Sequence, residues 1–186
     1  MTKSSYVPRM DNNELSKILG TPVKGDEKLF ELIVDTPFQF EAEAAFLFLG
    51  IDVLLLVNKK TGMIDRVAIS NTELATNTNN VSFVPFKDIK IPMAYPDNII
   101  SQAIQTGKPQ ETTDWKQLYA PALTTDQAHI NQASSGIAYS AVYPLQARDG
   151  GAMIFSFYQY SSNIGVPQKN FMKTYTSLVN ERLNKS

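Results

Sequence analysis

Residues 51–69 read IDVLLLVNKKTGMIDRVAI, and this stretch decides the fold. Its first seven residues are apolar apart from Asp52, so both faces of a strand formed by them would be apolar. Such a pattern is typical of a strand covered on both sides. Residues 58–62 then form a hairpin turn in which Gly62 can adopt a positive φ. Residues 63–69 return as a second strand, so the sequence predicts two adjacent antiparallel strands.

Helices are expected before this hairpin. Residues 26–48 carry apolar stripes at helical spacing, and Pro37 between them predicts a kink or two helices that meet there. The first 25 residues are polar and mixed, with Asp11 placed to cap a short helix. We interpret residues 1–25 as an N-terminal extension and residues 26–186 as one domain.

The chain after the hairpin mixes helices and short strands. Residues 70–80 are rich in Asn and Thr, which predicts a loop. Short strands are expected at 89–91 and 110–113, with a helix between them that begins near Pro96 and ends at Gly107.

The remaining elements complete an α+β order. Residues 124–127 resemble a capping box at the start of a helix. A second hairpin follows, with strands at 137–146 and 152–160, and Val166 and the proline after it open a final helix. This order predicts an antiparallel sheet of about five or six strands, sandwiched between terminal helices and a helical covering segment.

The composition is that of a globular protein with no nucleic-acid or membrane affinity. The chain has 186 residues, 43% of them hydrophobic and 19% charged, and a net charge of −1. Such a charge attracts neither nucleic acid nor an anionic membrane. The longest apolar run, residues 44–57, is shorter than the roughly 20 residues of a membrane span. The polar start of the chain is unlike a secretory signal, so we expect a cytoplasmic protein.

Three stretches resemble the GAF family, over residues 26–185. The first is AEAAFLFLGIDVLLLV at 42–57, a helix that runs into the first strand through a glycine. The second is AIQTGKP at 103–109, followed by Asp114, and the third is YPL at 143–145 with RDG at 148–150. PAS domains are the nearest alternative, but the long opening and closing helices favour GAF.

The resemblance implies a sheet with the terminal helices on one face. It also implies a small-molecule pocket on the other face, beneath residues 95–135, because family members serve as sensory or dimerisation modules. The chain contains no cysteine. Covalent bilin attachment and cysteine-based reduction of free methionine sulfoxide, both found in this family, are therefore excluded, as are disulfides and zinc–thiolate sites.

Cyclic nucleotide binding is not expected either. Asn58-Lys59 matches half of the family's cyclic-nucleotide signature, but the acidic pair expected after Phe83 is replaced by Lys87-Asp88. We interpret Asn58-Lys59 as part of the hairpin turn.

A catalytic role is not predicted. The single histidine, His129, is not accompanied by a Gly-x-Ser-x-Gly elbow. Asp114, Ser135 and His129 make a triad only as a coincidence of common residues. One histidine among scattered carboxylates also predicts no metal site.

Aromatic residues mark the expected ligand site. The candidates are Trp115, Tyr119, His129, Tyr139 and Tyr143, which fall in or beside the covering segment. Rings with polar tips suit a mostly apolar pocket that orients a small, partly apolar ligand. The same residues would also serve as ordinary core packing.

The alternative function is a ligandless module that associates through its terminal helices as a homodimer. The final helix carries an apolar stripe that includes Phe171, Tyr175 and Leu183. This stripe is wide enough to pack against a sheet, as well as to join a helix bundle.

Overall fold

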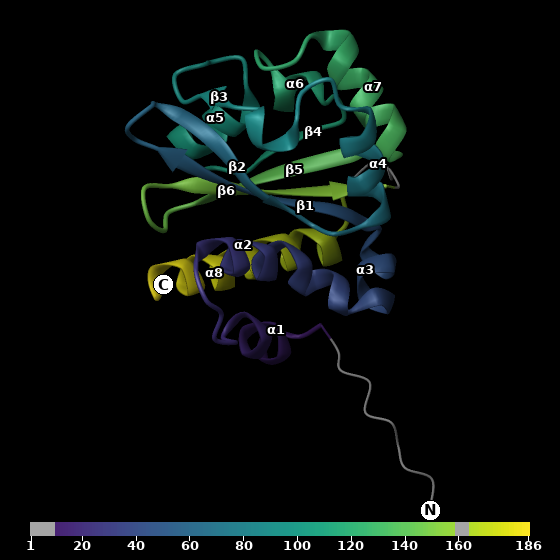
Figure 1. Ribbon diagram of the computed structural model, residues 1–186. Coiled ribbons are helices and arrows are strands. Elements are labelled where there is room, and N and C mark those ends of the chain that lie inside the picture. Colours follow the sequence, from purple (N-terminus) through teal and green to yellow (C-terminus); the bar gives the residue numbers. More distant parts are fainter. Residues whose placement is uncertain (1–9, 159–163) are drawn as a thin grey trace, which may run out of the picture.

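A computed structural model describes residues 10–158 and 164–186 (Figure 1). Its centre is a six-stranded sheet in the order β3-β2-β1-β6-β5-β4, in which every neighbouring pair is antiparallel. The expected antiparallel α+β sandwich is confirmed. The strands are β1 (Leu49–Asn58), β2 (Met63–Ile69), β3 (Ile91–Pro92), β4 (Gln110–Thr112), β5 (Tyr139–Leu145) and β6 (Gly151–Phe157).

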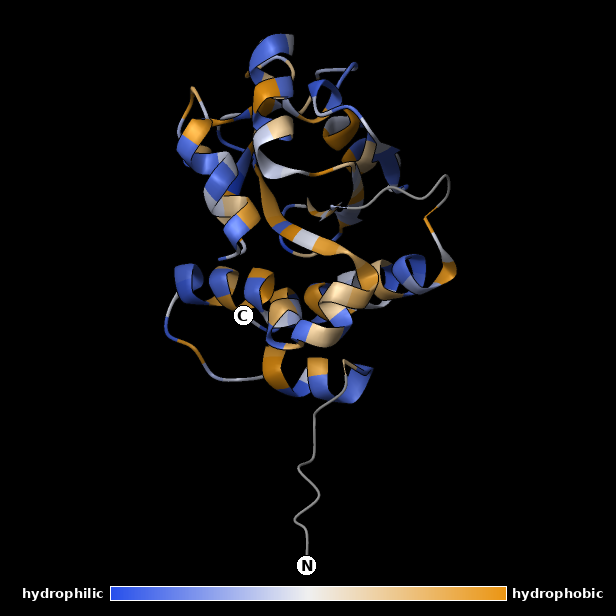
Figure 2. Ribbon diagram, turned by 90° about the vertical axis from the view of Figure 1, so that its right-hand side faces the viewer, coloured by the Kyte–Doolittle hydropathy of each residue, from blue (hydrophilic) through white to orange (hydrophobic). Residues whose placement is uncertain are grey.

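Helices cover both faces of the sheet (Figure 1). The helix layer consists of α1 (Asn12–Leu19), α2 (Asp26–Asp35), the 3₁₀ turn η1 (Thr36–Gln39), α3 (Glu41–Leu47) and α8 (Val166–Asn184). The cover on the opposite face consists of α4 (Glu73–Val81), the 3₁₀ turn η2 (Phe86–Asp88), α5 (Ile99–Thr106), α6 (Lys116–Tyr119) and α7 (Thr125–Ser135). Figure 2 shows hydrophobic residues concentrated in the strands, whereas the helices alternate between hydrophobic and hydrophilic residues.

Strand β1 separates two hydrophobic cores, because its side chains alternate between the two faces. Leu54 belongs to the core beneath the helix layer, and Val53 and Leu55 belong to the core beneath the cover. Beside it, β6 begins at Gly151, where a Cβ atom would lie 2.2 Å from the Leu55 carbonyl oxygen. Glycine at this position lets the two central strands approach each other.

A β-bulge interrupts β2. Leu54 of β1 pairs with Ala68, but the next residue, Leu55, pairs with Arg66, so Val67 is the extra residue. The bulge places Val67 and Ala68 toward the helix layer and leaves Arg66 on the cover face. Bulges of this kind redirect side chains and are frequent beside functional sites.

The helix layer is tied together by hydrogen bonds between distant segments. The Tyr175 hydroxyl donates to the Ile33 carbonyl at 2.5 Å, and Arg182 Nε donates to the Leu19 carbonyl at 2.6 Å. Leu15 and Leu19 of α1 are buried in the same core. Helix α1 therefore packs on the domain, while residues 1–9 lie outside the described residues and the boundary at residue 25 stays a prediction.

Several local expectations are confirmed. Asp11 caps α1, and two helices meet at the 3₁₀ turn that contains Pro37. Gly62 adopts the expected positive φ, 68°, and Gly107 ends α5 as expected, with a φ of 66°. The capping box at Thr124 is present, with the Thr124 and Gln127 side chains each accepting the other's backbone N–H.

The expected loop at 70–80 is wrong, because residues 73–81 form α4. Thr72 caps this helix by accepting the Ala75 N–H at 3.3 Å. Ala75 and Thr78 are buried, and α4 packs against α7. Tertiary packing thus overrides the weak helix propensity of Asn and Thr.

Two boundaries also differ from expectation. Helix α5 begins at Ile99 rather than near Pro96, because the Asn98 side chain accepts the N–H groups of Ile100 and Ser101. The expected strand at 152–160 is described to Phe157, and its last two residues lie outside the described residues. Within the described ranges, no helix has the length and hydropathy needed to cross a membrane.

Candidate functional site

A small enclosed cavity lies between the sheet and the cover. Its walls come from β1, β2 and β6 on one side and from α4 and α6 on the other. It is lined by Ile51, Val53, Arg66, Ile69, Thr78, Trp115, Leu118, Tyr119, Ile154 and Ser156. The volume open to the centre of a water molecule is about 20 Å³, which is room for about one water.

Two aromatic rings close this cavity from the side of α6. The rings of Trp115 and Tyr119 lie 5.4 Å apart with an angle of 42° between their planes. Trp115 Nε1 donates to Ser140 Oγ at 2.9 Å, and that oxygen lies 2.8 Å from Ser156 Oγ. A buried hydrogen-bond chain therefore joins the start of α6 to the central strands of the sheet.

Helix α7 holds the start of α6 in place. The Gln132 side chain of α7 accepts the Trp115 backbone N–H at 3.0 Å and donates to the carbonyls of Thr113 and Ile137. At its other end, α6 is held by Asn98, which donates to the Leu118 carbonyl at 3.1 Å. The positions of both rings are thus fixed by backbone contacts.

Arg66 is the only cationic side chain that lines the cavity, and it is 3% exposed. Its guanidinium carbon lies 4.5 Å from the centre of the Tyr119 ring and 5.9 Å from that of Phe86. Burial lowers the pKa of the guanidinium, and the neighbouring Tyr119 partly opposes this effect. Arginine nevertheless stays a cation at neutral pH.

The structure divides the five sequence-predicted site residues among three places. Trp115 and Tyr119 line the cavity. Tyr139 is buried in the core beneath the helix layer, where its ring lies 6.3 Å from Phe157. Tyr143 packs edge-on against Phe155 at 5.9 Å on that same face. Even spacing along β5 does give the two tyrosines a common face, but it is the face opposite the cavity.

The fifth candidate, His129, lies on the surface of α7. Its Nε2 atom is 3.0 Å from Asp114 Oδ1, and the two side chains are 51% and 45% exposed. The Ser135 hydroxyl donates to the Gln132 carbonyl and accepts the Ile137 N–H, so it is engaged with backbone groups. The three residues of the hypothetical triad do not converge.

The turn interpretation of Asn58-Lys59 is confirmed. Asn58 Oδ1 accepts the Lys60 N–H at 3.1 Å, and the Gly62 N–H closes the turn on the Asn58 carbonyl. Lys59 forms an exposed ion pair with Asp149 at 2.7 Å.

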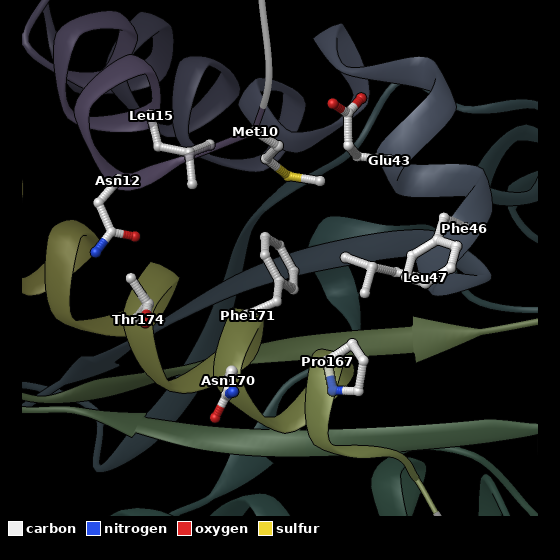
Figure 3. A pocket seen from close by; sticks show the side chains of 10 residues that line it. All are labelled: Met10, Asn12, Leu15, Glu43, Phe46, Leu47, Pro167, Asn170, Phe171 and Thr174. Atoms are coloured by element: carbon white, nitrogen blue, oxygen red, sulfur yellow. The ribbon is translucent and has the colours of Figure 1, made fainter.

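A second hollow lies on the outer surface of the helix layer (Figure 3). It has a volume of about 270 Å³. Side chains from α1, α3 and α8 line it, together with Met10. At its edge Phe46 is 69% exposed. This groove is open, apolar in part, and separate from the cavity beneath the cover.

Sequence reasoning missed Arg66, although a signal was present. In residues 63–69 the apolar Ile64 and the charged Arg66 are two residues apart, so their side chains lie on the same face of the strand. An apolar residue such as Ile64 indicates that this face is buried. The structure confirms this placement, because Ile64 is also buried beneath the cover. Within the described residues no cluster of three metal-ligating side chains occurs.

Comparison with solved structures shows a GAF-like fold. The phycocyanobilin-bound GAF domain of a cyanobacterial phytochrome has 12% identity and a TM-score of 0.60, with 96% of this chain and 97% of that chain covered. A domain of a putative two-component sensor histidine kinase from Sinorhizobium meliloti has 12% identity, a TM-score of 0.53, and coverage of 88% and 93%.

A third neighbour is the free methionine-R-sulfoxide reductase from Neisseria meningitidis in complex with its substrate. It has 11% identity, a TM-score of 0.56, and coverage of 92% of this chain and 85% of that chain. No protein-family model matches the sequence, and no curated protein matches it. The likeness therefore lies in the fold.

Proposed function

We propose that this protein is a non-catalytic, cytoplasmic sensory domain that binds a small, partly apolar molecule between the sheet and the cover. The observation that carries the proposal is the enclosed cavity beneath α4 and α6. Its walls are mostly apolar, and Arg66, Thr78 and Ser156 add polar groups. Such a combination is typical of ligand sites, where apolar walls supply affinity and a few polar groups fix orientation.

The structural neighbours support a regulatory role. One is a sensor histidine kinase domain, and another is a phytochrome domain that holds phycocyanobilin. The reductase among them shows that this fold can also carry catalysis. This chain has no cysteine, so it cannot attach a bilin covalently or reduce methionine sulfoxide through cysteines. Neither residue of the exposed His129–Asp114 pair lines the cavity.

A ligand larger than water has to displace part of the cover. Trp115 and Tyr119 are anchored through α7 and Asn98, so we propose that the part that moves is the segment between α4 and η2. Among the described residues a single side-chain hydrogen bond, from Asn131 to Ser82, joins this segment to α7. Phe83 in this segment is 60% exposed, and Phe86, the first residue of η2, lies beside Arg66 with its ring centre 5.9 Å from the guanidinium carbon. We expect this segment to move outward when a ligand enters.

A thermal-shift screen against small metabolites, purines and tetrapyrroles tests the proposal. A ligand that raises the melting temperature of the wild type should lose its effect in Tyr119→Ala, because Tyr119 lines the cavity. It should keep its effect in Tyr143→Ala, whose ring packs on the opposite face. The proposal fails if no compound stabilises the wild type, or if Tyr143→Ala alone abolishes the stabilisation.

A second candidate function is association of two copies through the terminal helices. Phe46 and Val166 are the observation in its favour, because they are 69% and 70% exposed at the ends of α3 and α8. Tyr175 is fully buried, so it does not offer a surface for association.

Sedimentation of the wild type and Phe46→Glu tests this second candidate. We expect a dimer at tens of micromolar that the charged variant dissociates. A monomeric wild type at that concentration would exclude a dimer of ordinary affinity. Lys28→Gln, on the exposed side of α2, lowers the net charge by one unit as Phe46→Glu does and serves as a control for the change of charge alone.

A further inference from the structure

We propose that the cavity beneath the cover binds a carboxylate, and that Arg66 is the residue that holds it. The inference rests on the proposed function and names the chemical class of its ligand: a monocarboxylate with a short apolar body. It is argued from the unsatisfied hydrogen-bonding groups of Arg66, from its aromatic neighbours and from the walls around it.

Arg66 is a buried cation without an anionic partner. Its Nε and Nη2 atoms are buried and have no hydrogen-bond partner among the described residues. None of the ion pairs found in residues 10–158 and 164–186 includes Arg66. Buried charges in proteins are ordinarily paired, because leaving one unpaired is costly. An unpaired buried charge at the wall of a cavity therefore points to a ligand that pairs with it.

The adjacent acid does not supply this partner. Asp65 accepts from Asn58 Nδ2 at 3.1 Å and lies 3.5 Å from Lys90 Nζ, so its carboxylate is directed to other cations and donors. Arg66 shares the cover face with Ile64, two residues before it, and the β-bulge follows at Val67. The chain thus places a cation in the cavity and its neighbouring anion elsewhere.

The two unsatisfied atoms are the ones that a carboxylate needs. In a guanidinium group, the Nε hydrogen and one Nη2 hydrogen point in parallel and form a fork that binds both oxygens of a carboxylate. The rings of Tyr119 and Phe86 contact the guanidinium carbon and stabilise its charge without satisfying these hydrogens. The aromatic contacts therefore stabilise the guanidinium while its Nε and Nη2 donors have no hydrogen-bond partner among the described residues.

The remaining walls define the rest of the ligand. Ile51, Val53 and Ile154 present aliphatic surface to the cavity, and Leu118 closes it from α6. Once the cover is displaced, a short branched aliphatic group would bury apolar surface against these side chains. A phosphate dianion would lose its hydration with one cation and no apolar gain in return. The walls accordingly favour a monocarboxylate over inorganic phosphate.

The test compares isobutyrate with isobutyramide, which have the same shape and differ in charge. Calorimetric titration and thermal shift on the full chain, at constant ionic strength, would measure both compounds. We expect isobutyrate to bind at least tenfold more tightly than isobutyramide, and its binding to change the fluorescence of Trp115. Inorganic phosphate and sodium chloride are the anion controls.

Two variants assign the binding to Arg66. Arg66→Met keeps an unbranched side chain of similar reach, and it removes an unpaired buried charge, so it should fold and lose isobutyrate binding at least tenfold. Lys60→Met removes an exposed positive charge on the hairpin turn and should bind isobutyrate as the wild type does. Retained binding by Arg66→Met would overturn the inference.

The outcomes separate this inference from the proposed function. Equal affinity for isobutyramide and isobutyrate, both lost in Tyr119→Ala, would overturn the carboxylate assignment and leave the ligand cavity supported. Phosphate binding in place of isobutyrate would likewise overturn the carboxylate class. No binding of isobutyrate up to about 20 mM, beyond the millimolar affinity expected of so small a ligand, would overturn it too.

Discussion

Replacing Asp52 by asparagine should change how the stability of this protein depends on pH. Asp52 lies in β1, is fully buried, and its two carboxylate oxygens have no hydrogen-bond partner among the described residues. Burial raises the pKa of this carboxyl well above its usual range, and the nearby charge of Asp35 raises it further. Tyr175 of α8 also interacts with Asp52, and burial raises the pKa of that phenol well above its usual range.

The sign and the size of the effect follow from proton binding. In the unfolded chain Asp52 ionises near its ordinary pKa of about 3.9, whereas the folded protein keeps its proton to higher pH. Above about pH 4 the folded state therefore binds more protons, and Asp52 lowers the free energy of unfolding by about 1.4 kcal/mol per pH unit. This loss continues as the pH rises, until the folded pKa is reached. An asparagine side chain at this position has the same shape and does not titrate, so the stability of the variant relative to wild type should increase with that slope.

Urea unfolding at about pH 4.5 and 5.5 measures the difference. Trp115 is the only tryptophan and is buried, so its fluorescence reports unfolding. Asp88→Asn, at an exposed position, is the matched control and should follow the wild type. If the Asp52→Asn and wild-type free energies change in parallel between these pH values, the carboxyl ionises in the folded state and the reasoning is wrong.

Three further substitutions test the packing. Gly151→Ala should destabilise by about 2 kcal/mol or more, because its Cβ would overlap the Leu55 carbonyl, and chemical denaturation would measure the loss. Tyr175→Phe should cost about 1 kcal/mol by the same assay, since it removes the hydrogen bond to the Ile33 carbonyl and leaves that oxygen unpaired. Asn98→Ala should cost about 2 kcal/mol, because it removes both the cap of α5 and the bonds that hold the end of α6. A melting temperature within about 1 °C of wild type for any of the three would contradict its prediction.

The sheet could be predicted from the sequence because its signals are local. A nearly continuous apolar run marks β1, and Gly62 marks the turn that follows it. Helix α4 could not be found in this way, because its Asn- and Thr-rich sequence resembles a loop. What makes it helical is the burial of Ala75 and Thr78, together with its packing against the distant α7.

The candidate site was only partly predictable for a related reason. Periodicity shows that Tyr139 and Tyr143 share a face, but which face it is depends on how β5 pairs with its neighbours and where the helices pack. Trp115 and Tyr119 lie in the cover itself, so their placement needed only the order of the elements. Arg66 was missed because a charged residue in a strand is ordinarily solvent-exposed, although it shares the buried face of Ile64.

Strand β6 contributes side chains to both hydrophobic cores. Ile154 and Ser156 face the cavity, while Phe155 and Phe157 face the helix layer. Phe155 in turn packs edge-on against Tyr175 of α8 at 6.3 Å. The thickness of one strand therefore separates the cavity wall from the side chains that pack against α8.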